Sequence, residues 1–263
     1  MSSAKVLFSA EELRLVRDPA VILTKNSVMA KVVELMAAQS EGYRPVWEGA
    51  IARAVAADDA AKNREATDGL AAASRTGGLA GELMAASPKI SKGENYRGLP
   101  WVMLDYPRFF GREDVFAIRT MFWWGHAFST TLHLKGKYRE LYLPVIEKHW
   151  AVLAEAGFRV GVSEDEWQHE HGDHNYGVLT GVEDLRRGQA GAAADPGGAP
   201  QAGGGAQNAG GAAHAGSSAH SRGVDPGGAR NFLKLSAAVG LDRWEVVPDA
   251  LTVMFKTLIS VLF

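Results

Sequence analysis

Hydrophobic and polar residues alternate along 116–134 in a way that is typical of two paired β-strands. The positions of shared parity on the two sides of Gly125 are Phe116, Ile118, Thr120, Phe122, Phe128, Thr130, Leu132 and Leu134. Faces must match across a hairpin, because a one-residue slip turns every side chain to the other side of the sheet. A three-residue loop of Trp124, Gly125 and His126 keeps one face apolar and gives glycine the positive-φ position. A helix over 113–124 remains the alternative, since the apolar residues there also follow helical spacing.

Helical spacing dominates the N-terminal part of the chain. A capping box at Ser9 and Glu12 predicts a first helix that ends near Arg17. Further helices are predicted over 26–39, with Gly42 beyond its end, from about Pro45 onward, and weakly through the Ala-rich stretch 56–86.

The second half mixes strand and helix patterns. The apolar run 99–106 predicts a buried strand, and 138–157 predicts a helix with Pro144 near its start or at a kink. Shorter strands are predicted over 158–162 and 232–236. The last predicted helix begins near Pro248 and carries an apolar stripe through Leu251, Phe255 and Leu258.

Residues 187–230 differ in composition from the rest of the chain. They contain no aromatic residue and, apart from Val224, no large aliphatic one. Such a stretch buries too little apolar surface to offset the entropy of ordering, which predicts a disordered Gly/Ala-rich loop insertion. The 33 residues after it are too few for a separate domain. We therefore expect one α+β domain over 1–263, with N-terminal helices packed on a small, mainly antiparallel sheet and a docked C-terminal helix.

Composition narrows the classes of function. Apolar residues make up 46% and charged residues 22% of the 263, and the net charge of −2 gives no global field for nucleic acid or an anionic membrane. The absence of cysteine excludes disulfides, thiolate metal ligands and a cysteine nucleophile. The sequence contains neither a secretion signal nor a membrane-spanning run, so a cytoplasmic protein without a cofactor is expected.

The second face of the predicted hairpin, with its loop, is a candidate ligand-binding surface. Its residues are Arg119, Trp123, Trp124, His126 and His133. If the N-terminal helices cover this face, it is core. If it is open, its aromatic and basic side chains can stack on a planar ligand. The charged stretch 88–97, interpreted as an exposed loop, offers a second binding surface.

Three histidines lie close together in EDEWQHEHGDHNY, residues 164–176. On a strand, His169 and His171 point the same way, and His174 can return across a turn, so three imidazoles could bind zinc. The same segment carries a capping-box pattern, and on a helix residues two apart diverge. A solvated acidic loop is the third interpretation.

Other catalytic signatures are incomplete or absent in the sequence. His169-Glu170 lacks the second histidine of HExxH, because Asp173 stands there. His171 and Asp173 match half of a non-haem iron triad, whose distant histidine would have to lie in the low-complexity segment or upstream in an unusual order. There is no phosphate-binding glycine motif and no G-x-S-x-G elbow.

Two stretches, SPKISKGENYRGLPWVMLDYPRFF (87–110) and EDVFAIRTMFWWGHAFSTTLHLKGKY (113–138), resemble an uncharacterised bacterial protein family of unknown function. A fainter likeness extends over 22–36. The resemblance implies no activity, site or cofactor, and the Gly/Ala-rich segment departs from it.

These observations favour a non-enzymatic binding or structural protein that acts on an unknown protein or small-molecule ligand. The alternative is a metal-dependent hydrolase that uses His169, His171 and His174, with Glu166 or Glu170 as base. A third hypothesis is assembly, including a homodimer, through an exposed Leu251, Phe255 and Leu258 stripe.

Overall fold

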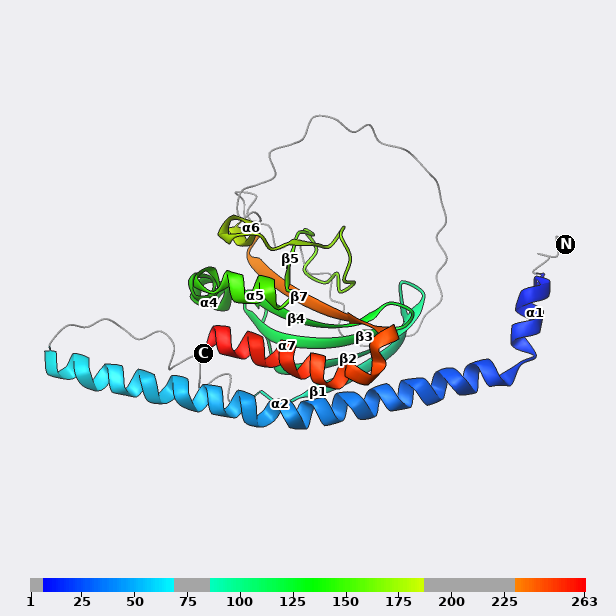
Figure 1. The fold of residues 1–263 in the computed structure, drawn as a ribbon, viewed down its shortest axis with the longest axis horizontal. Coiled ribbons are helices and arrows are strands. Elements are labelled where there is room, and N and C mark those ends of the chain that lie inside the picture. The colour runs from blue at the N-terminus through cyan, green and yellow to red at the C-terminus, as the bar shows by residue number, and fades with distance from the viewer. Residues whose placement is uncertain (1–6, 69–85, 187–229) are drawn as a thin grey trace, which may run out of the picture.

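A computed structural model describes residues 7–68, 86–186 and 230–263, which form one antiparallel sheet with helices on one of its faces (Figure 1). The strands, in spatial order, are β1 (Lys89–Tyr96), β2 (Leu99–Phe110), β3 (Val115–Trp123), β4 (Ala127–Lys135), β7 (Phe232–Gly240), β5 (Arg159–Gly161) and β6 (Tyr176–Val178). The helices are α1 (Ala10–Val16), α2 (Pro19–Asp68), α4 (Lys137–Lys148), α5 (Trp150–Glu155), α6 (Val182–Arg186), the 3-10 helix η1 (Leu241–Val246) and α7 (Val247–Leu262). The predicted α+β class is confirmed.

The predicted hairpin register is confirmed residue by residue. Strands β3 and β4 pair Phe122 with Phe128 and Ile118 with Leu132, as the matching of apolar faces requires. Gly125 has a φ of 75°, the conformation that the three-residue loop demands. The alternative helix over 113–124 is wrong, because the sheet pairs this segment on both sides.

Residues on both sides of 187–229 belong to the same sheet. Strand β7 pairs with β4 along its whole length and with β5 at Arg159 and Val160. The predicted strand 232–236 therefore exists and continues to Gly240. The predicted disorder of 187–230 lies almost entirely outside the described residues.

The predicted break between two N-terminal helices is wrong, because α2 continues through Gly42 and Pro45. One buried stripe stays in phase along the helix, and its residues are Met29, Val32, Met36, Tyr43, Trp47 and Ile51. A proline inside a helix costs about 3 kcal/mol. Burial of each large apolar side chain contributes roughly 1.5–3 kcal/mol, so the stripe outweighs the proline. Helix α1 has the predicted capping box but no buried residue, so it does not pack on the sheet.

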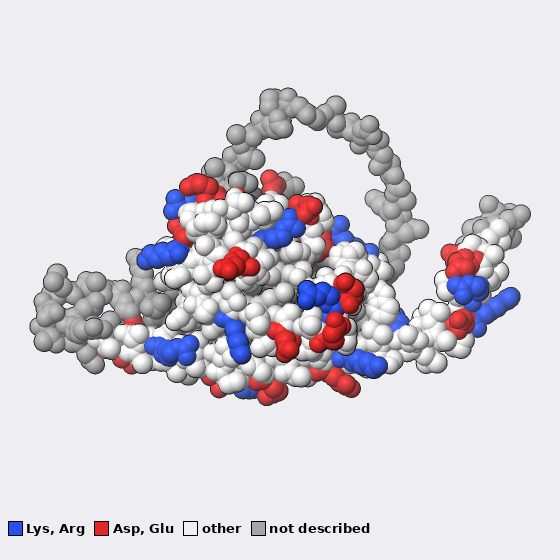
Figure 2. Space-filling view, in the orientation of Figure 1, with Lys and Arg blue, Asp and Glu red and all other residues white. Residues whose placement is uncertain are grey.

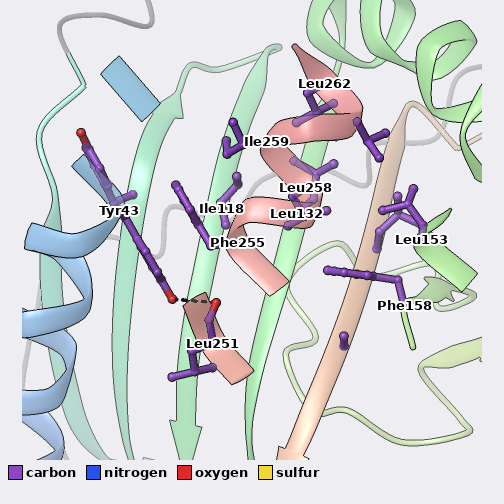
Figure 3. Packing of buried hydrophobic residues seen from close by; sticks show 14 of the residues in the cluster. Tyr43, Ile118, Leu132, Leu153, Phe158, Leu251, Phe255, Leu258, Ile259 and Leu262 are labelled. Atoms are coloured by element: carbon purple, nitrogen blue, oxygen red, sulfur yellow. Dashed lines mark hydrogen bonds between the residues drawn. The ribbon is translucent and has the colours of Figure 1, made fainter. Parts of the chain in front are cut away.

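The C-terminal stripe faces the core and not the solvent. Leu251, Phe255 and Leu258 are at most 1% exposed, packed between the sheet and α2 (Figure 3). The hypothesis of assembly through this stripe is therefore wrong. Of the helices in the described ranges, none is long and apolar enough to cross a membrane.

Two further expectations need correction, and two short elements were not predicted. The stretch 88–97 is the edge strand β1 and not a loop, since Lys89 to Gly93 pair with β2. The helix expected over 138–157 breaks at His149, and Pro144 lies inside α4. The short elements β6 and α6 have too few residues for a periodic pattern, and they were not predicted.

Candidate functional site

The second face of the sheet is polar, and the segment 162–175 covers it. Its inward-facing strand residues are Asp105, Arg119, Thr131, His133, Lys135, Tyr176, Lys234 and Ser236. We call this surface the polar face. Of the two alternatives for this face, cover by the N-terminal helices is wrong, because α2 packs on the opposite, apolar face.

Arg119 and Asp105 form a two-point ion pair on the polar face. They lie opposite each other on β3 and β2, with Nε 2.6 Å from Oδ1 and Nη2 3.1 Å from Oδ2. The remaining Nη1 lies 3.2 Å from Nε2 and 3.3 Å from Nδ1 of His169, and because a guanidinium can only donate, this contact favours the neutral imidazole. Burial lowers the pKa of His169 well below its ordinary range, and the charges of Arg119 and Lys234 lower it further.

His133 and Lys135 bind one buried carboxylate, that of Glu166. His133 Nε2 lies 3.1 Å from Oε2, and Lys135 Nζ donates to Oε1 at 2.8 Å. Burial lowers the pKa of His133 to about 4, so the imidazole is neutral at pH 7. Burial alone would raise the pKa of Glu166, but the hydrogen bonds from both partners outweigh it and leave the pKa below its ordinary value.

Glu170 anchors the covering segment to the turn between β1 and β2. Only 3% exposed, it accepts from the Tyr96 hydroxyl, pairs closely with Arg97, and lies 3.1 Å from His174 Nε2. The Tyr96 hydroxyl also accepts from the backbone N–H of His169 at 2.8 Å. Through these contacts two consecutive residues of the segment are held against the polar face.

Lys234 carries a buried positive charge in the middle of the polar face. It is 3% exposed, donates to the Gln168 carbonyl, and lies with Nζ 5.4 Å from the centre of the Tyr176 ring. Within the described residues no carboxylate lies in ion-pair distance, 4.0 Å, of this nitrogen. Burial lowers the pKa of Lys234 to about 8, and the charge of Arg119 adds to the effect.

A small pocket opens beside this network, at the β3–β4 turn. Its lining residues are Met121, Trp123, His126, Ala127, Ser129, His169, Glu170 and His171. Its volume of about 20 Å³ has room for one water molecule. A larger ligand could enter only if the covering segment moved.

The five predicted ligand-binding residues do not form one surface. His126 stacks on Trp123, with ring centroids 3.6 Å apart, and both line the pocket. Segment 162–175 covers Arg119 and His133. Arg119 pairs with Asp105, and His133 binds Glu166. Trp124 packs against the apolar core beside Phe122, on the other face. The alternative of an open face with aromatic and basic side chains is therefore wrong.

The three predicted metal ligands have three different partners. His169 contacts Arg119, His171 Nε2 lies 3.3 Å from the Ser236 carbonyl, and His174 contacts Glu170. Among the residues that the structure describes, no three His, Asp or Glu side chains are grouped to hold a metal ion. The segment is a loop, as the third interpretation had it, but it is not fully solvated, because Glu166 and Glu170 are buried.

The residues that sequence reasoning missed are Asp105, Lys234, Tyr96 and Tyr176. A signal for two of them existed: Asp105 and Lys234 are lone charges inside the apolar runs LPWVMLDY and FLKLS. A charged residue within a strand of an otherwise buried sheet indicates a polar second face. The chain matches no protein-family model, no curated protein and no solved structure.

Proposed function

We propose that this chain is a non-enzymatic binding protein whose polar face takes a small anion, through carboxylate or phosphate oxygens, at Lys234. The buried ammonium of Lys234 is the observation that carries the proposal. A buried charge costs several kcal/mol unless it is paired. The Gln168 carbonyl and the Tyr176 ring solvate the ammonium of Lys234 only in part. An anionic oxygen would supply the missing partner.

The charges around Lys234 are mixed: beyond the effect of burial, Arg119 lowers its pKa, whereas Asp165, Glu170 and Glu166 raise it without forming a hydrogen bond to its ammonium. The charges of Arg119 and Lys234 lower the pKa of His169, so further positive charge is disfavoured in this network. Nε and Nη2 of Arg119 already bind the carboxylate of Asp105. The ammonium of Lys234 is therefore the cationic group that can bind a ligand.

Access requires the covering segment to give way at one contact. The ligand oxygen would take the place of the Gln168 carbonyl on Lys234. Residues 164–175 contain no helix or strand, so their displacement breaks no backbone ladder. The anchors at Glu166 and Glu170 would hold both ends of the moving part.

The test is thermal unfolding and calorimetric titration with inorganic phosphate, acetate and citrate at constant ionic strength. Binding stabilises the folded state by mass action, so we expect at least one anion to raise Tm in proportion to its concentration. Lys234→Met should abolish the shift, whereas Lys256→Met, at an exposed lysine of α7, should preserve it. No shift with any anion, or equal shifts in both variants, would contradict the proposal.

A further inference from the structure

The N-terminal arm, residues 7–24, consists of α1 and the first turns of α2 and extends beyond the edge of the sheet (Figures 1 and 2). It carries a concentration of exposed large apolar side chains, between 38% and 81% exposed: Leu7, Phe8, Leu13, Leu15, Val16, Val21, Ile22 and Leu23. No residue of α1 is buried. Such a concentration of exposed large apolar side chains indicates an interaction site on a globular protein.

Local interactions are too weak to hold α1 in place. The capping box at Ser9 contributes about 1 kcal/mol. The exposed Glu11–Arg14 pair adds a few tenths at most (about 0.2–0.5 kcal/mol). Isolated helices shorter than about 12 residues are marginal in water, because nucleation is costly. Stable helix in the arm therefore requires a surface that covers its apolar side chains.

The chain's other segments cannot supply that surface. Position 68 lies about 65 Å from position 23 along α2, at 1.5 Å per residue. The segment 69–85 spans about 60 Å even when fully extended, and it must also return to β1. Residues 187–229 have Val224 as their one large apolar side chain, and residues 1–6 add Met1 and Val6.

We infer that the arm pairs with the arm of a second copy of this chain, antiparallel about a two-fold axis. Glu11 and Glu12 occupy the first turn of α1, while Arg17 and Arg14, which also pairs with Glu11 of its own helix, lie at its end. Antiparallel pairing sets each acidic turn level with the basic turn of the other copy and opposes the helix dipoles. Such an interface is isologous, with one self-complementary patch used twice. The arm is close in size to the roughly 20 residues per partner of a standard interface.

Sedimentation equilibrium of the full chain across the micromolar range tests this inference. We expect a dimer, and we expect the double variant Leu13→Glu and Val16→Glu to be monomeric with an unchanged circular dichroism spectrum of the sheet. Val253→Glu is the matched control, since Val253 is 60% exposed on α7, away from the arm. A monomeric wild type, or equal loss of dimer in the control, would overturn the inference.

Crosslinking gives a second readout, because the chain has no cysteine of its own. Leu13→Cys, which lies close to the two-fold axis of the antiparallel pairing, should form a disulfide-linked dimer under mild oxidation, and Val253→Cys should not. If the wild type were monomeric and pelleted with anionic lipid vesicles in an arm-dependent way, the arm would be a membrane contact and the dimer would be wrong. Anion binding at Lys234 is unaffected by either result.

Discussion

The ring of Tyr43 lies flat on the ring of Phe255, with centroids 3.9 Å apart and 1° between the planes. The Tyr43 hydroxyl also donates to the Leu251 carbonyl at 3.2 Å (Figure 3). These contacts join the middle of α2 to α7, and both helices pack on the apolar face of the sheet. The long helix and the C-terminal helix are thereby parts of one core.

Substitutions at Tyr43 should separate the contribution of its hydroxyl to stability from that of its ring. Tyr43→Phe removes a buried hydrogen bond and should lower the free energy of unfolding by about 1 kcal/mol. Tyr43→Ala also removes the stacked ring and leaves a cavity, so we expect a loss of about 3–5 kcal/mol. Urea unfolding followed by circular dichroism measures both. Equal stability of the two variants would show that the ring contact is unimportant.

His133 should make the fold sensitive to acid. Burial lowers its pKa from 6.5 to about 4, so the folded state binds fewer protons than the unfolded state between these values. Stability is therefore lost as pH falls from 6.5 towards 4, by at most about 3 kcal/mol from this group. His133→Gln keeps an N–H that can reach Glu166 but cannot titrate. The variant should lose less stability than the wild type over this window, and an identical pH profile would contradict the assignment.

Local patterns predicted the elements whose faces differ in polarity. The β3–β4 register followed from matching the Phe122 and Phe128 faces, and the α7 stripe followed from helical spacing. The break at Gly42 and Pro45 was wrong because propensity is a local term, whereas the burial of Tyr43 and Trp47 depends on contacts with α7 and the sheet, far along the chain.

Asp105 and Lys234 signal a polar face in the sequence, but the partners of its side chains could not be predicted, for the same reason. Segment 162–175 has no periodicity, so nothing local places Glu166 beside Lys135 or Glu170 beside Tyr96. The histidines were recognised as chemically distinctive, but their partners come from β3 and β7. Spacing along the chain could not show that the three imidazoles diverge.

The Arg119–Asp105 pair should behave as a coupled unit. Arg119→Met alone leaves a carboxylate that is 6% exposed without its counterion, at a cost of about 3–5 kcal/mol. Adding Asp105→Leu removes the orphaned charge and should recover much of that loss. Urea unfolding of the two single variants and the double variant measures the coupling. Additivity within about 0.5 kcal/mol would mean that the pair does not interact.

Gly136 should tolerate no side chain. Its φ is 58°, and an added Cβ would lie 2.2 Å from Oδ1 of Asp114, the oxygen that accepts from the backbone of Lys137 at the start of α4. Gly136→Ala should destabilise the fold by more than about 1 kcal/mol. Gly181→Ala is the matched control, because a Cβ there meets nothing within 4 Å. Equal melting temperatures for the two variants would contradict the prediction.

The buried charge of Lys234 should lower the free energy of unfolding of the protein. Its pKa falls from 10.5 in the unfolded chain to about 8 in the fold, so the folded state binds fewer protons between these values. The destabilisation is complete below pH 8 and fades as pH rises towards 10.5. Lys234→Met removes this cost, of at most about 3 kcal/mol, together with one hydrogen bond worth about 1 kcal/mol. We expect the variant to be more stable than the wild type at pH 7 by about 2 kcal/mol.

The difference in unfolding free energy between Lys234→Met and the wild type should shrink above pH 8. It should also shrink at pH 7 when a bound anion stabilises the wild type alone. Urea unfolding at pH 7 and at pH 10, with and without phosphate, measures both effects against Lys256→Met. If the Lys234 variant were less stable than the wild type at pH 7, the ammonium would already be well solvated by Gln168 and Tyr176, and the case for an anion partner would fail.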